Sequence, residues 1–419
     1  MKEFIEKQEK KAAGVFKQID EIALFNQGKV LDAFKECRIE ARHMHGSSGY
    51  GYDDAGKTAL NAVFSKVFKT ESALVSPLIA SGTHAIGLSL YGVLRPGDTL
   101  LSISGTPYDT LYETINGRGT GSLKDFNINF KEIPLKNNGF DKAKILKALK
   151  DGGINVVYIQ RSRGYAWRPA LSIAQIRDII VEMRKAGPEL CVMVDNCYGE
   201  FTDKNEPTDV GADVAIGSLI KNAGGGIAPC GGYIVGKKQY IDLIANRLTV
   251  PGIGAEVGSY AHGYREFFQG LFMAPHVTAQ SLKGSVLAGL CMAALGYETS
   301  PDIKKIPLDI IRAVKFNNEK ELTGFCVSIQ HNSPVDGFVT PEAWAMPGYA
   351  DKVIMAAGAF VQGSSIELSC DAPIRPPYIA YLQGGLTYEH VRIAIEKTAK
   401  MLCNTSSCYV SLGHVHEVQ

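Results

Sequence analysis

Short apolar runs alternate with helical stretches between about residues 73 and 250, and this alternation constrains the fold more than any other feature. One intervening stretch, 172–185, starts with Ser172, a residue type that caps helices, and repeats apolar residues at helical spacing. Strands that are apolar throughout and separated by helices are typical of a mostly parallel sheet covered on both faces. The sequence therefore predicts an α/β fold, with these strands: 73–79, 99–103, 155–159, 191–194, 214–217 and 232–235.

The segments on either side of this block have other patterns. Apolar residues recur at helical spacing in the first 40 residues, and a glycine- and tyrosine-rich loop follows at 45–56. After residue 249 a glycine-containing stretch leads into a long helical region, and a last helix is expected at 388–402. We expect three parts: an N-terminal helical segment with this glycine- and tyrosine-rich loop (1–56), a large domain (57–255), and a long linking helix with a smaller C-terminal α+β domain (256–419).

Charge and composition exclude several kinds of partner. The chain has 44 basic and 43 acidic residues, a formal net charge of +1 and no basic stripe, so nothing predicts binding to nucleic acid or to a membrane surface. No apolar run is long enough to span a bilayer, and the polar first residues lack the apolar core of a secretory signal. Nine cysteines without a C-x-x-C pair indicate free thiols in a reducing, cytoplasmic setting.

Two motifs place polar groups next to predicted strands. At Ser81-Gly82-Thr83 a strand runs into a helix, and backbone N–H groups at a helix start, beside a glycine, can bind phosphate. The alternative is a glycine turn with a hydroxyl cap. Asp195 ends an apolar strand, at the edge where ligands of open α/β sheets bind. The alternative there is a carboxylate that caps the next turn.

A third motif has Ser218 at a strand end, Lys221 three residues later, and three glycines at 224–226. Seven of the chain's 44 glycines lie from 217 to 236, which indicates close approach of backbone to a ligand. A lysine in such an otherwise apolar stretch can be a desolvated amine with a lowered pKa, the form that makes a Schiff base. The alternative is an exposed turn lysine. P-loop and Rossmann patterns are missing at these strands.

The order of the three motifs is more informative than any one of them. A phosphate site, a strand-end aspartate and Ser-x-x-Lys follow one another, and Asp195 precedes Lys221 by 26 residues. This is the arrangement of the large domain in fold-type-I enzymes that use pyridoxal 5'-phosphate (PLP). In such a site the aspartate keeps the ring nitrogen protonated, and the lysine holds the aldehyde as an imine and later moves protons.

Ten segments resemble the methionine gamma-lyase-like, or aluminium-resistance, family, which is related to the enzymes of cysteine and methionine metabolism. The resemblance covers roughly residues 25–400 and implies the PLP-dependent transferase fold (fold type I). It implies a carbon–sulfur lyase of methionine gamma-lyase or cystathionine beta-lyase type, which converts a sulfur amino acid into a thiol, ammonia and a 2-keto acid. The segments are GYGYDDAGK, ASGTHAIG, SGTPYDTL, IQRSRGY, VDNCYGEF, SLIKNAGGGIAPCGGYIVG, QGLFMAPH, MPGY, VIMAAGAFVQGSSIELS and PPYIAYLQGGLTYEH.

The resemblance also implies roles for single residues. Lys221 binds PLP covalently as an imine, and Asp195 contacts the pyridine nitrogen. Tyr108 stacks on the cofactor and protonates a leaving thiolate, and Arg375 binds the substrate carboxylate. The phosphate is held by four residues: Ser81, Gly82, Thr83 and Ser218. For Tyr108 a core aromatic, and for Arg375 a surface arginine, are the alternatives.

Relatives of this class share active sites between the two chains of a dimer, so a homodimer or homotetramer is implied. Tyr50 would then reach the substrate, and Tyr52 the cofactor, of the neighbouring subunit. Those relatives have Tyr-x-Arg at this point, whereas this chain has Asp54 where the arginine is expected. Lys57 is a candidate for the missing positive charge.

Other readings of the sequence remain open. Arg161 and Arg163 follow a strand end and either reach the site or form salt bridges in a loop. The same cofactor could support transamination or aldol cleavage.

A different class, a non-enzymatic metal-tolerance protein, would use thiols and histidines. We expect no metal site, because the cysteines lack ligand spacing and neither His43-x-His45 nor His414-x-His416 has a third ligand nearby in sequence.

Overall fold

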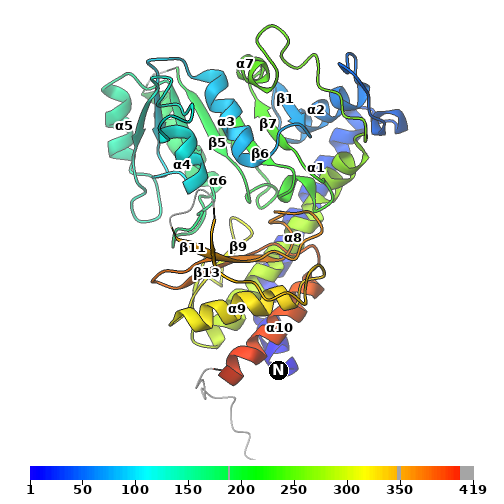
Figure 1. The fold of residues 1–419 in the computed structure, drawn as a ribbon, viewed down its shortest axis with the longest axis vertical. Coiled ribbons are helices and arrows are strands. Elements are labelled where there is room, and N and C mark those ends of the chain that lie inside the picture. The colour runs from blue at the N-terminus through cyan, green and yellow to red at the C-terminus, as the bar shows by residue number, and fades with distance from the viewer. Residues whose placement is uncertain (187–188, 347–350, 406–419) are drawn as a thin grey trace, which may run out of the picture.

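The structure, a computed structural model, describes residues 1–186, 189–346 and 351–405. A large unit is built on a seven-stranded sheet and a small unit on a six-stranded sheet, and two long helices run along one side of both (Figure 1). His414, His416 and Cys408 lie outside the described residues. None of the helices in the described ranges combines the length and the apolar character needed to cross a bilayer.

The large sheet confirms the predicted α/β fold. Its strand order is β1-β7-β6-β5-β4-β2-β3, in which β6, β5, β4, β2 and β3 are mutually parallel and β7 is antiparallel to both of its neighbours. All six predicted strands are present. The strands are β1 (Ser72–Ser76), β2 (Thr99–Ser102), β3 (Asn129–Glu132), β4 (Val156–Gln160), β5 (Cys191–Asp195), β6 (Val214–Ser218) and β7 (Gly232–Gly236).

Helices cover both faces of this sheet because successive strand residues point to opposite sides. On β4, Tyr158 packs in the cluster under α3, α4 and α7, while Val157 packs under α5 and α6. Ser172 caps α6 as predicted, accepting a hydrogen bond from the Gln175 N–H. The helices are α2 (Ala55–Val67), α3 (Gly82–Val93), α4 (Asp109–Asn116), α5 (Lys142–Lys150), α6 (Ile173–Lys185) and α7 (Lys238–Leu248), with short 3₁₀ turns at Ala41–Met44, Pro207–Val210 and Asn222–Gly224.

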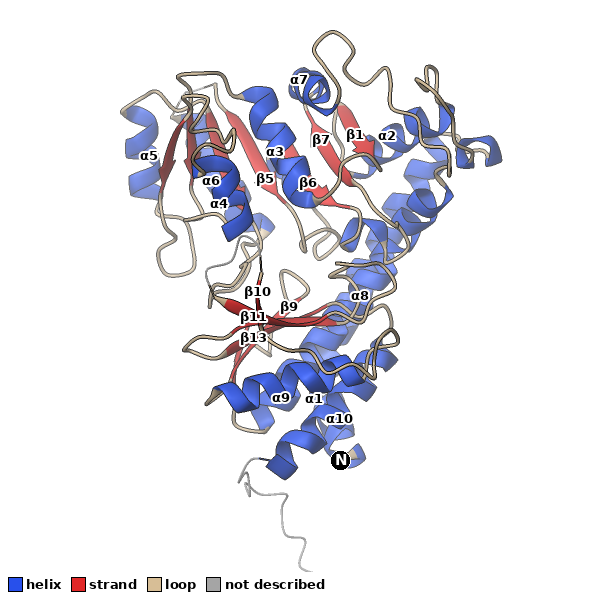
Figure 2. Cartoon of the chain, viewed as in Figure 1, coloured by secondary structure: helices blue, strands red, loops and turns tan. Residues whose placement is uncertain are grey.

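The small unit is an antiparallel sheet of strand order β10-β11-β12-β13-β9-β8. Helices α9 (Glu319–His331) and α10 (Tyr388–Thr405) cover the face that points away from the large unit (Figure 2). On the other face, Ile379 and Tyr381 pack against Tyr165 and Tyr198 of the large unit. The strands are β8 (Glu298–Ser300), β9 (Ile311–Lys315), β10 (Trp344–Ala345), β11 (Lys352–Ala356), β12 (Ser369–Pro373) and β13 (Ile379–Gln383).

The two long helices, α1 (Lys2–Glu36) and α8 (Arg265–Ala294), connect the units. The start of α1, at Ile5, packs in the core of the small unit with the end of α8, whereas Val30 packs in the large unit with the start of α8. The two helices are therefore antiparallel and bury apolar side chains against each other between these ends. This packing connects the large sheet and the small sheet through shared apolar contacts. The predicted domain limits at residues 56 and 255 stay a prediction.

Candidate active site

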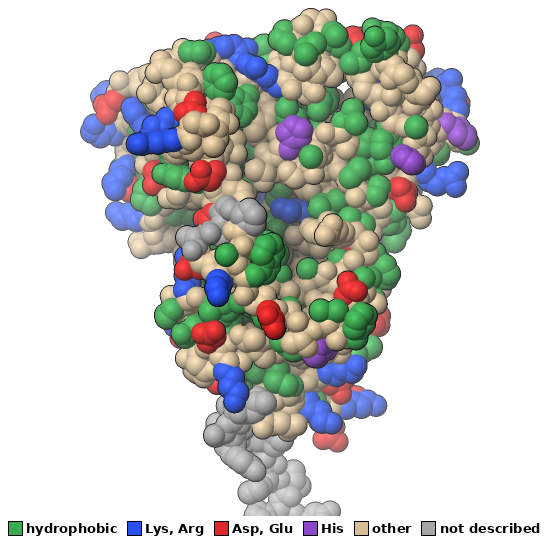
Figure 3. All heavy atoms as spheres, in the orientation of Figure 1, with side chains coloured by type: hydrophobic (Ala, Val, Ile, Leu, Met, Phe, Trp, Pro, Cys, Tyr) green, Lys and Arg blue, Asp and Glu red, His purple; other side chains and the backbone are tan. Residues whose placement is uncertain are grey.

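A cavity of about 240 Å³ lies between the large sheet and the small sheet. A space-filling view shows a recess at this level, with a basic side chain visible inside it (Figure 3). Its walls come from the carboxyl ends of β4 and β5, the start of α3 and α4, the segment after β6, and β12 of the small unit. Five predicted residues border the cavity: Gly82, Thr83, Tyr108, Asp195 and Lys221.

Asp195 ends β5 in register with Gln160, the last residue of the parallel strand β4. Its carboxylate accepts hydrogen bonds from the Cys197 N–H at 3.1 Å and from the Tyr158 hydroxyl at 3.3 Å. Burial raises the pKa of Asp195, while the charge of Lys221 and these hydrogen bonds act in the opposite direction. Asp195 is thus a fixed carboxylate inside the protein, able to face a positively charged ring nitrogen.

Lys221 follows β6 and precedes the 3₁₀ turn Asn222–Gly224. Its ammonium nitrogen lies 4.0 Å from the centre of the Tyr198 ring. The prediction of a lowered pKa for Lys221 is wrong for the chain by itself. Burial alone would lower this pKa, but the acidic groups around the amine, led by Cys197, Tyr198 and Asp195, outweigh burial and raise it. The sequence showed the apolar neighbours of Lys221 but not the acidic side chains that the fold brings to it.

The predicted phosphate site forms where α3 begins. The Ser81 hydroxyl accepts a hydrogen bond from the His84 N–H at 3.0 Å, so this side chain acts as the helix cap that the sequence left as an alternative. Gly82 stands close to β6: a Cβ at this position would lie 3.2 Å from Cys197 Sγ and 3.3 Å from Ser218 Cβ. Glycine therefore keeps open the space between the start of α3 and the end of β6.

Ser218 supplies the observation that tests a phosphate group against this site. Its side chain is buried, and its hydroxyl has no hydrogen-bond partner among the residues that the structure describes. Buried hydroxyls almost always have a partner, so an unpaired donor here fits an acceptor that comes with a ligand. A phosphate oxygen, also facing the N–H groups at the start of α3, is such an acceptor. The residues present therefore fit a phosphate-bearing cofactor.

Tyr108 directly precedes α4, and it lines the cavity. Its hydroxyl lies 2.8 Å from Thr83 Oγ1, and its backbone N–H donates to Gln160 Oε1 at 3.1 Å. Burial, followed by the charge of Asp195, raises the pKa of Tyr108, which keeps the phenol protonated. The side chain also packs against the core cluster under α3 and α4, so both sequence readings of this residue describe part of its environment.

Five predicted residues are not among those that line the cavity: Ser81 and Ser218, which were described above, and Arg375, Tyr50 and Tyr52. Arg375 follows β12, forms an ion pair with Asp351 at 2.7 Å, and borders a second pocket of about 200 Å³, which we name the side pocket. Tyr165 borders both the cavity and the side pocket. Tyr50 and Tyr52 are 71% and 62% exposed, and their rings contact each other at a tilt of 40° with ring centres 5.6 Å apart. Their predicted roles concern a second chain and stay predictions.

Three cationic side chains that the sequence left open have structural partners. Lys57 Nζ donates to three backbone carbonyls, those of residues 255, 256 and 257, at 3.0 to 3.3 Å. Arg161 is buried and donates to Asn196 Oδ1 and to the Gly199 carbonyl, both at 2.7 Å, which holds the loop after β5. Arg163 donates to Ser300 and lies beside Asp309.

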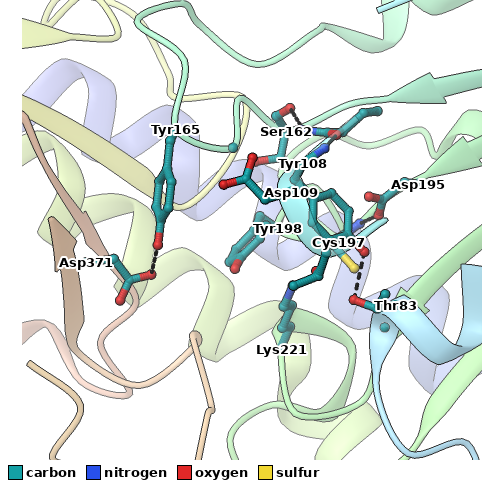
Figure 4. Close-up of a pocket in the computed structure, with 14 residues that line it drawn as sticks. Thr83, Tyr108, Asp109, Ser162, Tyr165, Asp195, Cys197, Tyr198, Lys221 and Asp371 are labelled. Atoms are coloured by element: carbon teal, nitrogen blue, oxygen red, sulfur yellow. Dashed lines mark hydrogen bonds between the residues drawn. The ribbon is translucent and has the colours of Figure 1, made fainter. Parts of the chain in front are cut away.

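Sequence reasoning missed several cavity residues, chief among them Tyr165, Tyr198 and Asp371. Tyr198 has a φ of +70°, a rare conformation for a bulky residue, and its place three positions after Asp195 was the available signal. Asp371 comes from the small unit, and nothing local in the sequence connects it to Lys221. Figure 4 shows Asp371 and Tyr165 on one side of Lys221 and Asp195, Cys197 and Thr83 on the other.

The structure offers no group of three or more His, Cys, Asp or Glu side chains placed to hold a metal ion, within the three ranges that it describes. Arrangement and donor chemistry favour an organic cofactor instead. The cavity combines an amine, a buried carboxylate and the start of a helix around one space.

Comparisons with known proteins agree with this arrangement. The family described as methionine gamma-lyase matches residues 1–403. The Bacillus subtilis protein YnbB is 48% identical over 386 residues, which cover 91% of this chain and 92% of YnbB. A crystal structure from Clostridium novyi NT, described as a carbon-sulfur lyase involved in aluminium resistance, has a TM-score of 0.92 and 50% identity and covers 95% of both chains. The PLP-dependent Escherichia coli protein YhfS shares the fold, with a TM-score of 0.61 and 16% identity over 91% of this chain and 97% of YhfS.

Proposed function

The chain belongs to the methionine gamma-lyase family, and from this premise we propose that it cleaves a carbon–sulfur bond in a sulfur amino acid by elimination. The protein is a PLP-dependent lyase. The observation that supports the proposal most strongly is the cavity itself, which brings Gly82, Asp195 and Lys221 together from three separate stretches of sequence. The unpaired Ser218 hydroxyl lies next to it, beside Gly82.

Each part of the site suits one part of the cofactor. Ser218 and the N–H groups at the start of α3, beside Gly82, would hold the phosphate. Asp195 would hold the ring nitrogen in its protonated form. Lys221 would bond the aldehyde through Nζ, and Tyr108 would lie against the ring. Bound PLP supplies an electron sink that stabilises negative charge at the α-carbon of the substrate.

The chain's own residues then move the protons. The raised pKa of Lys221 belongs to the chain without cofactor. As the neutral amine, Lys221 Nζ would take the proton from the α-carbon and could return it to a neighbouring carbon. The Tyr108 hydroxyl, kept protonated by its raised pKa and placed 2.8 Å from Thr83 Oγ1, is positioned to give a proton to the leaving thiolate. Arg375, after leaving Asp351, would hold the substrate carboxylate from the side pocket. Elimination releases the thiol, and one molecule of water then hydrolyses the remaining enamine to ammonia and a 2-keto acid.

A second chain completes the proposed site. Tyr50 and Tyr52 are exposed on the loop before α2, which leaves both side chains available to a neighbouring subunit. In a homodimer or homotetramer, Tyr50 would contact the substrate and Tyr52 the cofactor of that neighbour.

The test compares the wild-type protein with Lys221→Ala and with Lys185→Ala, which removes an exposed surface lysine paired with Glu182. Wild type and Lys185→Ala should be yellow and should release thiol and keto acid from cystathionine, methionine or cysteine. Lys221→Ala should lose both the absorbance and the activity. A colourless wild-type protein that takes up no added PLP would contradict the proposal, and amino exchange with an added keto acid would favour transamination.

A further inference from the structure

A carboxylate without a counter-ion faces the cavity from the small unit. Asp371 lies in the middle of β12, and its Oδ2 accepts hydrogen bonds from Gln383 Nε2 at 3.2 Å and from the Tyr165 hydroxyl at 3.5 Å. Both donors are neutral, and no ion pair within the described part of the chain includes Asp371. Asp371 is half-buried, and carboxylates that are partly withdrawn from solvent gain from pairing with a cation, because desolvating an unpaired charge is costly. The missing partner therefore points to a positively charged ligand.

The position of Asp371 indicates which part of a ligand it would meet. Asp195, Cys197 and Thr83 lie on the cofactor side of Lys221, whereas Asp371 and Tyr165 lie on the opposite side (Figure 4). The nearest cation along the strand, Arg375, is taken up by Asp351. Among the described residues that line the cavity, Lys221 is the single cationic side chain, and the cofactor would engage its amine. Asp371 thus faces the space that remains for the substrate's side chain.

We propose that Asp371 determines substrate specificity by binding a positively charged group at the far end of the substrate's side chain. This inference rests on the proposed function and narrows its substrate class to thioether amino acids whose leaving half carries an ammonium group. Gln383 and Tyr165 both donate to Oδ2, which leaves the other carboxylate oxygen, Oδ1, for the ligand. Burial raises the pKa of Asp371 to about 6, while its two hydrogen bonds and the charge of Lys221 act in the opposite direction.

Two isosteric substrates test the proposal on the holoenzyme. S-(2-aminoethyl)-L-cysteine and S-propyl-L-cysteine have the same number of heavy atoms, but one ends in an ammonium group and the other in a methyl group. We expect kcat/KM to be roughly 10- to 100-fold higher for the aminoethyl compound, the size of one charge-assisted hydrogen bond. The homocysteine analogues are compared in the same way for γ-elimination. A ratio near one in wild type overturns the proposal without any variant.

Asp371→Asn keeps the shape of the side chain and removes its charge, so the ratio should fall to near one. Asp109→Asn is the matched control, because Asp109 also lines the cavity but belongs to α4 of the large unit. This control should retain the preference. If Asp109→Asn lowers the ratio as much as Asp371→Asn does, the preference comes from the overall charge of the cavity, and the assignment to Asp371 is wrong.

A binding measurement separates this inference from the proposed function. L-Lysine and L-2-aminoheptanoate form another isosteric pair, and neither has a leaving group. Their dissociation constants are read from the change in cofactor absorbance. In wild type the constant for lysine should be the lower of the two, and in Asp371→Asn the two constants should be similar. Failure of elimination with this preference intact would refute the lyase activity alone. Equal dissociation constants in wild type would refute the role of Asp371, whatever the activity.

Discussion

Replacing Ser218 with alanine should weaken cofactor binding without weakening the fold. In the chain without cofactor the Ser218 hydroxyl is buried and unpaired, so the protein already bears the cost of desolvating it. An unsatisfied buried polar group costs about 1–3 kcal/mol. Removing the hydroxyl removes this cost and leaves only a one-atom void. The free energy of unfolding of Ser218→Ala, without PLP, should therefore equal or exceed that of wild type.

Whereas the substitution should not lower the stability of the cofactor-free protein, it should weaken the binding of PLP. A hydrogen bond to a charged phosphate contributes about 1.5–3 kcal/mol, which corresponds to a roughly 10- to 150-fold rise in the dissociation constant of PLP. Titrating cofactor-free protein with PLP and following the absorbance measures this constant, and urea unfolding of the same protein measures stability. Both experiments use the same preparation, so a misfolded variant is recognised at once.

Ser285→Ala is the matched control, because the Ser285 hydroxyl is also buried and unpaired but lies in α8 and does not line the cavity. Its free energy of unfolding in urea should change as that of Ser218→Ala does, whereas its dissociation constant for PLP should equal that of wild type. The reasoning fails if Ser218→Ala binds PLP within twofold of wild type. It also fails if the variant loses stability without cofactor, because the hydroxyl would then have a partner inside the chain.

Two further predictions concern stability and assembly. Burial raises the pKa of Glu200 to about 8. Between about pH 5 and pH 8 the folded chain therefore holds a proton that the unfolded chain has lost. The free energy of unfolding should fall as pH rises through this range, by at most about 1.4 kcal/mol per pH unit. Glu200→Gln should flatten this slope in urea titrations across that range; an unchanged slope would speak against the raised pKa. Mixing inactive Tyr52→Phe and Lys221→Ala subunits should restore part of the activity if sites are shared between chains, and no recovery after verified subunit exchange would count against sharing.

The alternation of strand-length apolar runs and helical stretches was enough to predict the large sheet, because burial on both faces leaves a local mark on each strand. The order of the motifs around Gly82, Asp195 and Lys221 was enough to predict that they meet. Strand ends and helix starts of a parallel sheet lie at the same edge, so their neighbourhood in space follows from their place in the sequence.

Only the tertiary structure decided what surrounds that edge. Asp371 reaches the cavity because the small sheet packs against the large unit through Tyr165 and Tyr198, and such packing has no local signal. The same contacts leave Arg375 in the side pocket with Asp351. The pKa of Lys221 rises because the fold gathers acidic groups around it, whereas its neighbours in sequence are glycine and apolar residues. The interaction between two charged groups depends on their distance in space. The sequence by itself determines which ionisable groups the chain contains, and the fold determines which of them lie close together.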